Sequence, residues 1–348
     1  MRALSYVLLA SVLLAAGCSN ISYYMQSIHG QFSVMQARER IEDVIADPQT
    51  SPTLRTKLQR VTAIRRFASR ELDLPDNSSY RGYADVRRKF VVWNVFAAGE
   101  FSIEPRQWCF MIVGCVSYRG YFKLENAEAL ARDLRAEGDD VFVGGVPAYS
   151  TLGWFDDPVL NTFVNYPDFE LARLIFHELA HQVVYIRSES DFNESFAAAV
   201  EAEGVKRWIA ANGDEKMNAD FARSQLRRSQ FSTLVLKYRD ELAALYARVL
   251  PADEMRARKR ATIAALQDEY AHLKNEWGGY AGYDRFFVEP NNAKLASVAI
   301  YTAYVPQFER MIASHHGDLA AFYAEVKALA ALPVNARATR LAELAPER

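Results

Sequence analysis

The sequence predicts an α+β protein in which a small mixed sheet is followed by a mostly helical region. Three observations favour this class. Runs of β-branched and aromatic residues are confined to the stretch from about residue 89 to residue 163. Apolar residues at the three- and four-residue spacing of amphipathic helices precede and follow that stretch. Two histidines four residues apart, His177 and His181, stand in the second helical region, where this spacing places them on one face of a helix.

Length and composition are those of an ordinary globular protein. The chain has 348 residues, 50% of them hydrophobic, and we expect residues 76–348 to form one compact unit. The formal net charge of −2 gives no electrostatic reason to expect a nucleic-acid partner. The sequence does not indicate an oligomeric state.

The N-terminus predicts export. Residues 1–17 contain Arg2 and then an apolar run that has the length of a signal-peptide core and is short for a membrane span. The small residues before Cys18 resemble the bacterial lipobox, which implies that Cys18 is diacylated. Because Ser19 is typical of sorting to the outer membrane, we expect a lipid-anchored protein of the bacterial cell envelope that faces the periplasm. The alternative is a signal peptide that is cleaved near Ala16 without lipidation.

Two regions precede the histidines. We expect residues 18–75 to form a helical lead-in that packs on the main body. Residues 76–165 are expected to be rich in β-structure, with one helix at about 126–135. The strands that we expect there are about 90–96, 108–113, 116–122 and 141–146.

Cys109 and Cys115 enclose Gly114 in a stretch that reads as strand, turn and strand. A compartment that permits disulfides would allow a bond between them, which would close a short hairpin. Two buried free thiols are the alternative.

Residues 166–348 are expected to be helical and to carry the catalytic site. The first helix begins near Pro167, and its apolar stripe consists of Leu171, Leu174, Ile175, Leu179 and Val183. A second helix is expected at about 194–211, followed by a long charged helical hairpin over about 214–277.

His177, Glu178 and His181 form an H-E-x-x-H pattern on the first of these helices. The spacing points both imidazoles at the same spot, where they can hold one Zn²⁺ ion. The adjacent glutamate can then act as general base toward a water on the metal. Two core histidines that merely share a helix face are the alternative.

A catalytic zinc ion needs a third protein ligand. Glu194 is the first candidate, although Asp191 and Glu194 also fit a capping box, in which the glutamate would only satisfy a backbone amide. Glu201 lies two turns further along the same helix face and is the rival ligand. Glu203 reads as a surface charge.

The pattern H-E-x-x-H followed by N-E-x-F-A at 193–197 resembles the gluzincin metallopeptidases, especially the neutral zinc aminopeptidases. This resemblance implies a zincin-like fold, Glu194 as the third zinc ligand, and Glu201 as a supporting glutamate behind the ligands. One departure is that only 12 residues separate His181 from Glu194, fewer than is usual in gluzincins. Glu201 would restore a familiar distance and therefore stays a candidate ligand.

Longer segments are similar to a bacterial family of predicted aminopeptidases, many of them lipoproteins. These segments are Gly114-Cys115-Val116 with Tyr118, and residues 120–122, 149–155, 177–182 and 193–197. The resemblance implies a zinc-dependent peptidase that removes N-terminal residues from a peptide substrate. An envelope endopeptidase, or a non-catalytic assembly or binding lipoprotein on the same scaffold, is the alternative. Asp156 and Asp157 are the candidates for acidic groups that would hold the substrate's α-amino group.

Ser150, Thr151, Leu152 and Gly153 lie between the expected sheet and the histidine helix. Zinc peptidases often bind an extended substrate along an edge strand in this position. We therefore expect a substrate-binding edge strand here, and an ordinary loop is the alternative.

The expected mechanism also needs a donor for the negative charge that develops on the substrate's carbonyl oxygen. The candidates are the tyrosines of the C-terminal region, Tyr280, Tyr283, Tyr301 and Tyr304. Weaker candidates, which belong to no recognisable pattern, are His272, His315 and His316.

Overall fold

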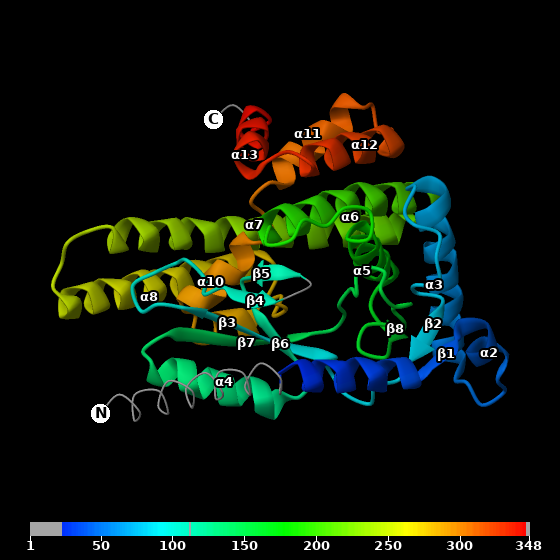
Figure 1. Cartoon of the computed structure of the whole chain (residues 1–348), viewed down its shortest axis with the longest axis horizontal. Coiled ribbons are helices and arrows are strands. Elements are labelled where there is room, and N and C mark those ends of the chain that lie inside the picture. Colours follow the sequence, from blue (N-terminus) through cyan, green and yellow to red (C-terminus); the bar gives the residue numbers. More distant parts are fainter. Residues whose placement is uncertain (1–22, 111–112, 346–348) are drawn as a thin grey trace, which may run out of the picture.

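The computed structural model describes residues 23–110 and 113–345 (Figure 1). The expected signal peptide at 1–17 and the expected lipidation site Cys18 lie outside these residues. The α+β class is confirmed, because helices make up most of the described chain and the strands form small sheets. Within the described ranges, no helix is long and apolar enough to cross a bilayer.

The helices match the periodic segments of the sequence. Residues 23–36 form the first of them. The others are α2 (Ile41–Ala46), α3 (Pro52–Glu71), α4 (Leu124–Ala136), α5 (Asp168–Ala180), α6 (Ser190–Asn212), α7 (Glu215–Tyr246), α8 (Ala252–Glu276), α9 (Asp284–Phe287), α10 (Asn292–Ala299), α11 (Val305–Ser314), α12 (Leu319–Ala330) and α13 (Val334–Glu343).

The described strands form three small sheets rather than the single mixed sheet that we expected. Their orders are β1-β2-β8, β6-β3-β7 and β4-β5, and only the first is mixed, because β2 pairs antiparallel with β1 and parallel with β8. The strands are β1 (Arg38–Arg40), β2 (Gly82–Ala84), β3 (Val92–Ala98), β4 (Trp108–Phe110), β5 (Gly114–Val116), β6 (Arg119–Tyr121), β7 (Asp140–Val146) and β8 (Val159–Leu160).

Strand β1 corrects the expectation of an entirely helical lead-in over 18–75. Arg38, Glu39 and Arg40 pair with residues 82–84 at the edge of their sheet. Three consecutive charged residues show no alternation of apolar and polar side chains, so this strand has no sequence signature. Charged residues are, however, typical of exposed edge strands.

The antiparallel sheet β6-β3-β7 separates a helix from the interior of the molecule. Val95 and Ala97 of the central strand β3 pack with Ala127 and Ala131 of α4 in one buried cluster. In Figure 1, α4 lies along the outer face of this sheet. Because successive strand residues point to opposite faces, Asn94 points away from α4.

Helix α6 lies at the centre of the helical region. It packs against α5 on one side and against α11 on another. Phe196 and Val200, in the middle of the helix, are completely buried, and Trp208 is 1% exposed. A helix that is buried on several faces carries apolar residues around most of its circumference, which explains why α6 lacks a single apolar stripe.

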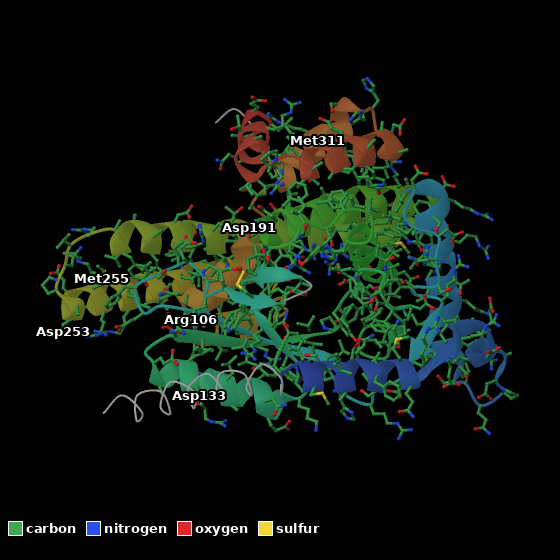
Figure 2. All side chains as sticks on the ribbon, viewed as in Figure 1. Arg106, Asp133, Asp191, Asp253, Met255 and Met311 are labelled. Carbon is green, nitrogen blue, oxygen red and sulfur yellow. A yellow bond between two sulfur atoms is a disulfide. The ribbon has the colours of Figure 1, made fainter. Side chains whose placement is uncertain are left out.

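Helices α7 and α8 form the long hairpin that the sequence predicts over 214–277. The hairpin has its own core, which contains Leu234 and Met255, whereas Met311 of α11 is buried in the main core together with α6 (Figure 2). The charged residues of the hairpin lie on its exposed faces, as expected for a solvated helical pair.

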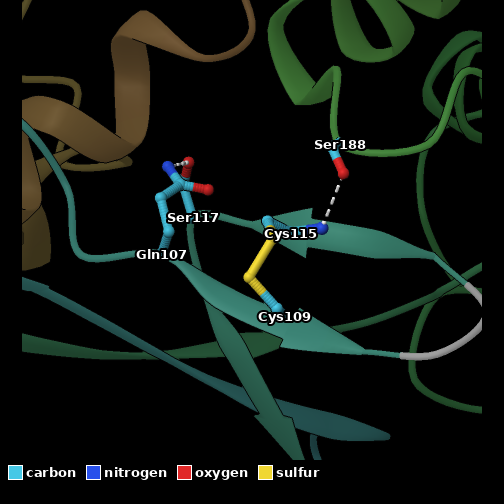
Figure 3. The surroundings of a disulfide bond; sticks show 5 residues. All are labelled: Gln107, Cys109, Cys115, Ser117 and Ser188. Carbon is cyan, nitrogen blue, oxygen red and sulfur yellow. Dashed lines mark hydrogen bonds between the residues drawn. A yellow bond between two sulfur atoms is a disulfide. The ribbon is translucent and has the colours of Figure 1, made fainter.

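A disulfide joins Cys109 on β4 to Cys115 on β5 (Figure 3). The backbone N–H of Cys115 donates a hydrogen bond of 2.9 Å to Ser188 Oγ, in the connection between α5 and α6. Gly114 has a φ of 80°, and a Cβ added there would lie 2.3 Å from Ser188 Oγ. Glycine is therefore required at position 114 for the β4–β5 hairpin to approach the loop that leads to α6.

Replacing Phe196 with alanine tests the central packing of α6. The ring contacts Phe308, Phe322 and Tyr323, so its removal leaves a cavity and should lower the free energy of unfolding by about 3–5 kcal/mol. The measurement is urea unfolding followed by circular dichroism. Phe32→Ala, at a side chain that is 63% exposed, is the control and should change the free energy by less than about 0.5 kcal/mol.

Candidate metal centre and cavity

The two histidines of the motif converge on one carboxylate. His177 lies in the last turn of α5 and His181 directly follows the helix, and their ring centroids are 4.9 Å apart. Glu194 Oε2, on α6, lies 3.2 Å from His177 Nε2 and 3.7 Å from His181 Nε2. The carboxylate does not cap α6, whose N-terminus has no side-chain cap. The capping-box alternative for Glu194 is therefore wrong.

The spacing of these ligand atoms suits a small divalent cation. One ligand atom from each of His177, His181 and Glu194 can be chosen so that all three lie within 4.8 Å of one another. Four ligands at about 2.1 Å around a tetrahedral ion lie about 3.4 Å apart, between the two distances above. Two imidazoles and one carboxylate also form a donor set that zinc accepts, and they leave room for a fourth ligand.

Glu201 lies behind the histidines and faces a different nitrogen. Its Oε2 is 2.9 Å from His177 Nδ1, so it orients the ring whose Nε2 faces Glu194. Arg228 on α7 donates a 2.7 Å hydrogen bond to Glu201 Oε1, and Arg173 on α5 donates one of 3.5 Å. Although burial raises the pKa of Glu201, these two cations and His177 lower it overall. The glutamate therefore stays ionised and supports the imidazole, as carboxylates behind metal-binding histidines do.

Burial and neighbouring charges shift the pKa values of the motif residues in different directions. Burial lowers the pKa of His181 to about 4, so this ring is neutral at pH 7 and can offer a lone pair. Burial also lowers the pKa of His177, but hydrogen bonds to Glu194 and Glu201 outweigh it and raise the pKa to about 10. His177 must therefore release a proton when it binds a cation. Burial raises the pKa of Glu178 to about 8, and a nearby cation would favour its charged form.

Comparison with known proteins agrees with the resemblance drawn from the sequence. A family model described as "Putative aminopeptidase" matches residues 22–341. The chain belongs to this family. No curated protein and no solved structure matches it. Membership supports a peptidase, and the H-E-x-x-H helix lies within the matched residues.

A cavity of about 480 Å³ opens onto the candidate metal centre. Its lining includes His177, Glu178, His181 and Glu194, together with residues of the helix 23–36 and of strands β3, β5 and β6. Most of the remaining lining is aromatic or aliphatic. A cavity of this size can enclose a few residues of a peptide.

Residues Ser150 to Gly153 do not form the edge strand that we expected. Thr151 to Phe155 form a tight turn, in which Leu152 has a φ of 56° and Gly153 a φ of 80°, values outside the β region of backbone conformations. Ser150, Thr151 and Leu152 nevertheless line the cavity, and the Ser150 hydroxyl donates to the carbonyl oxygen of Glu178 at 3.4 Å. The sequence thus placed this segment beside the site but in the wrong conformation.

Of the tyrosines considered as hydrogen-bond donors to the substrate's carbonyl oxygen, Tyr301 lies at the site. Tyr301 lines the cavity, and the Glu194 carboxylate is the main cause of its raised pKa, which indicates that the two groups are close. Tyr280 and Tyr283 pack with Trp277 instead, and Tyr304 lines a separate cavity of about 670 Å³. None of the weaker candidates, His272, His315 and His316, is among the described residues that line the cavity at the metal centre.

The acidic residues considered as anchors for the α-amino group lie elsewhere. Asp156 is half exposed and 3.8 Å from Arg38. Asp157 is buried, and its Oδ2 accepts a 2.9 Å hydrogen bond from the backbone N–H of Thr151, so it stabilises the turn. Glu203, read as a surface charge, forms an ion pair with Arg207.

Sequence reasoning missed the arginines behind the site and the N-terminal wall of the cavity. Arg173 precedes His177 by one helical turn, and this spacing could have identified it. Arg228 and Tyr23 reach the site from distant parts of the chain and had no local signal. Asn94 is a lone amide in an apolar strand, and this departure from the apolar pattern could have identified it.

Asp157 gives a prediction about pH. Burial raises its pKa to about 6, from about 3.9 in an unfolded chain. The folded state thus binds more protons between these values, and the free energy of unfolding falls as pH rises from about 4 to about 6. Asp157→Asn should therefore be more stable than the wild type by about 2 kcal/mol at pH 7, with no advantage at pH 4.

Thermal unfolding between pH 4 and pH 8, with a chelator present, measures this difference. Asp156→Asn, which makes the same change at the neighbouring half-exposed side chain, is the control. An advantage of Asp157→Asn that stays constant over this range would contradict the burial argument.

Proposed function

We propose that the protein is a zinc-dependent aminopeptidase. The observation that carries the proposal is the convergence of His177, His181 and Glu194, with Glu178 beside them, on the wall of a cavity of peptide size. A site that only stabilised the fold would have no use for an acid–base group next to its metal ligands. Family membership supports the choice of a peptidase, and of an aminopeptidase in particular.

In this proposal His177, His181 and Glu194 hold the ion, and Glu201 fixes the orientation of His177. Zinc, when bound, would lower the pKa of a water molecule and polarise the substrate's carbonyl group. Glu178 takes a proton from the attacking water and delivers it to the amine that leaves. The Tyr301 hydroxyl donates a hydrogen bond to the oxygen that gains negative charge.

We also propose that the protein works in the bacterial cell envelope, held by a lipid on Cys18 at the outer membrane and facing the periplasm. This rests on the sequence of residues 1–19 alone. Its substrates would then be peptides present in that compartment.

A substrate panel tests the proposed activity. The purified protein is assayed, with and without a chelator, on amino-acyl amides, on the same compounds with an acetylated amine, and on internally quenched peptides. Hydrolysis of the free-amine compounds alone, lost with chelator and restored by zinc, is the expected result. Cleavage of blocked and internal peptides would indicate an endopeptidase instead. Zinc binding without any hydrolysis would indicate a binding protein on the same scaffold.

Two variants separate the metal ligands from the base. Glu178→Gln should retain zinc and lose turnover by about 10³-fold or more, because the proton acceptor is removed while all three ligands remain. His181→Ala should lose the zinc itself. Elemental analysis and rates of peptide hydrolysis are the measurements, and a Glu178→Gln protein with wild-type activity would refute the assignment.

Glu201→Gln tests the group behind His177. The change keeps the shape of the side chain but removes the charge that holds the imidazole, so zinc affinity should fall about 10- to 100-fold. Glu203→Gln, two residues along the same helix and outside the cavity, is the matched control and should bind zinc as the wild type does. Competition with a chromogenic chelator measures both affinities. Equal affinities would show that Glu201 has no role in ordering the site.

A further inference from the structure

The cavity next to the candidate metal centre is charged only at one end. Among its described lining residues, Glu178 and Glu194 are the only carboxylates, and none is lysine or arginine. The other walls come from the helix 23–36 and from the strands, and they include Tyr23, Tyr24, Val92, Phe110, Val116 and Phe122. A charged substrate side chain placed against these walls would lose its hydration without gaining a counter-charge.

Among the polar side chains that line these walls, Asn94 of the central strand β3 stands out. It lines the cavity and is 8% exposed. Its side-chain amide makes no hydrogen bond within the described residues. Two hydroxyls of the lining are bonded: that of Ser27 donates to Tyr23 O, and that of Tyr149 donates to Gln31 Oε1. Gln31 Nε2, on the helix 23–36, is the other lining amide group that is buried without a partner within the described residues.

The sheet leaves space around Asn94. In the register of β6-β3-β7, Asn94 lies opposite Gly120 on one side and opposite Gly144 on the other. Residues directly opposite each other in a sheet point to the same face, so Asn94 stands between two residues without side chains. A Cβ added at Gly120 would lie 3.1 Å from Asn94 Oδ1. Gly120, which lines the cavity, thus leaves a recess beside the amide, whereas the ring of Phe142 occupies the space next to Gly144.

We propose that Asn94 determines which side chain the cavity accepts. The apolar walls accommodate a bulky apolar body, and the amide needs a hydrogen-bonding partner when substrate displaces water from it. A substrate side chain that ends in an uncharged group able to donate and accept hydrogen bonds satisfies the amide, whereas a side chain with an apolar end leaves the amide without a partner. The substrate class is therefore a peptide with a bulky side chain that ends in an uncharged polar group, and tyrosine fits best. This inference rests on the proposed function, because it takes the cavity as the substrate site.

Binding of amino-acid amides tests the inference without requiring hydrolysis. The full-length, zinc-loaded protein is titrated calorimetrically with L-tyrosinamide, L-phenylalaninamide and L-lysinamide. Tyrosinamide should bind about tenfold more tightly than phenylalaninamide, since one hydrogen bond is gained, and lysinamide should bind most weakly. Failure of all three amides to bind, or equal affinities for tyrosinamide and phenylalaninamide, would overturn the proposal.

Two substitutions at Asn94 should change selectivity in opposite ways. Asn94→Leu removes the polar group at nearly constant size, so the preference for tyrosinamide over phenylalaninamide should vanish or reverse. Asn94→Asp adds a charge at constant shape, so the affinity for lysinamide relative to phenylalaninamide should rise about tenfold. A purely structural role for Asn94 would weaken binding of all three ligands alike, and that outcome would overturn the proposal.

A glycine pair provides the matched control. Gly120→Ala crowds the recess and should weaken tyrosinamide binding, whereas Gly99→Ala, whose new Cβ would meet only Ser102 at 3.6 Å, should not. Equal effects of the two changes would contradict the recess.

Hydrolysis of the same amides is measured in parallel. Selective binding without any hydrolysis would contradict the proposed function but support the role of Asn94 in ligand selection. Zinc-dependent hydrolysis without a preference for tyrosinamide over phenylalaninamide would contradict only the role of Asn94.

Discussion

A buried carboxylate, that of Glu201, holds the centre of the molecule together. It is 4% exposed and meets an imidazole of α5 and two guanidinium groups, from α5 and α7. Removing such a charge from water is costly unless opposite charges and hydrogen bonds replace the water. The side chains that surround Glu201, those of Arg173, His177 and Arg228, must therefore stay in contact with it. In this way three helices that pack mainly through apolar contacts are fixed in the register that the candidate metal centre needs.

The sequence predicts the features that depend on local spacing. The class, the helix that carries the motif, the charged hairpin over 214–277 and the direction of His177 and His181 all follow from side chains within a few turns of one another. The choice between Glu194 and Glu201 does not follow, because both lie on the same face of α6. The structure separates them by the nitrogen that each faces: Glu194 faces Nε2 of His177, and Glu201 faces Nδ1.

Features that depend on contacts between distant segments had no signature in the sequence. The helix 23–36 forms a wall of the cavity more than a hundred residues before the motif, and Arg228 reaches Glu201 from α7. The substrate strand expected at 150–153 failed for a local reason instead. Leu152 adopts a positive φ, which is uncommon for a residue with a Cβ and gives no hint in a sequence.

The disulfide hairpin links the cavity to the chemistry of the surrounding compartment. Phe110 and Val116, which line the cavity, are neighbours of the two bonded cysteines. In a reducing cytoplasm the chain would carry two thiols at this place, and this wall would lose its covalent brace. Under the export that we propose, the cavity would be completed only after translocation. The proposed peptidase would then spare the peptides of the compartment in which it is synthesised.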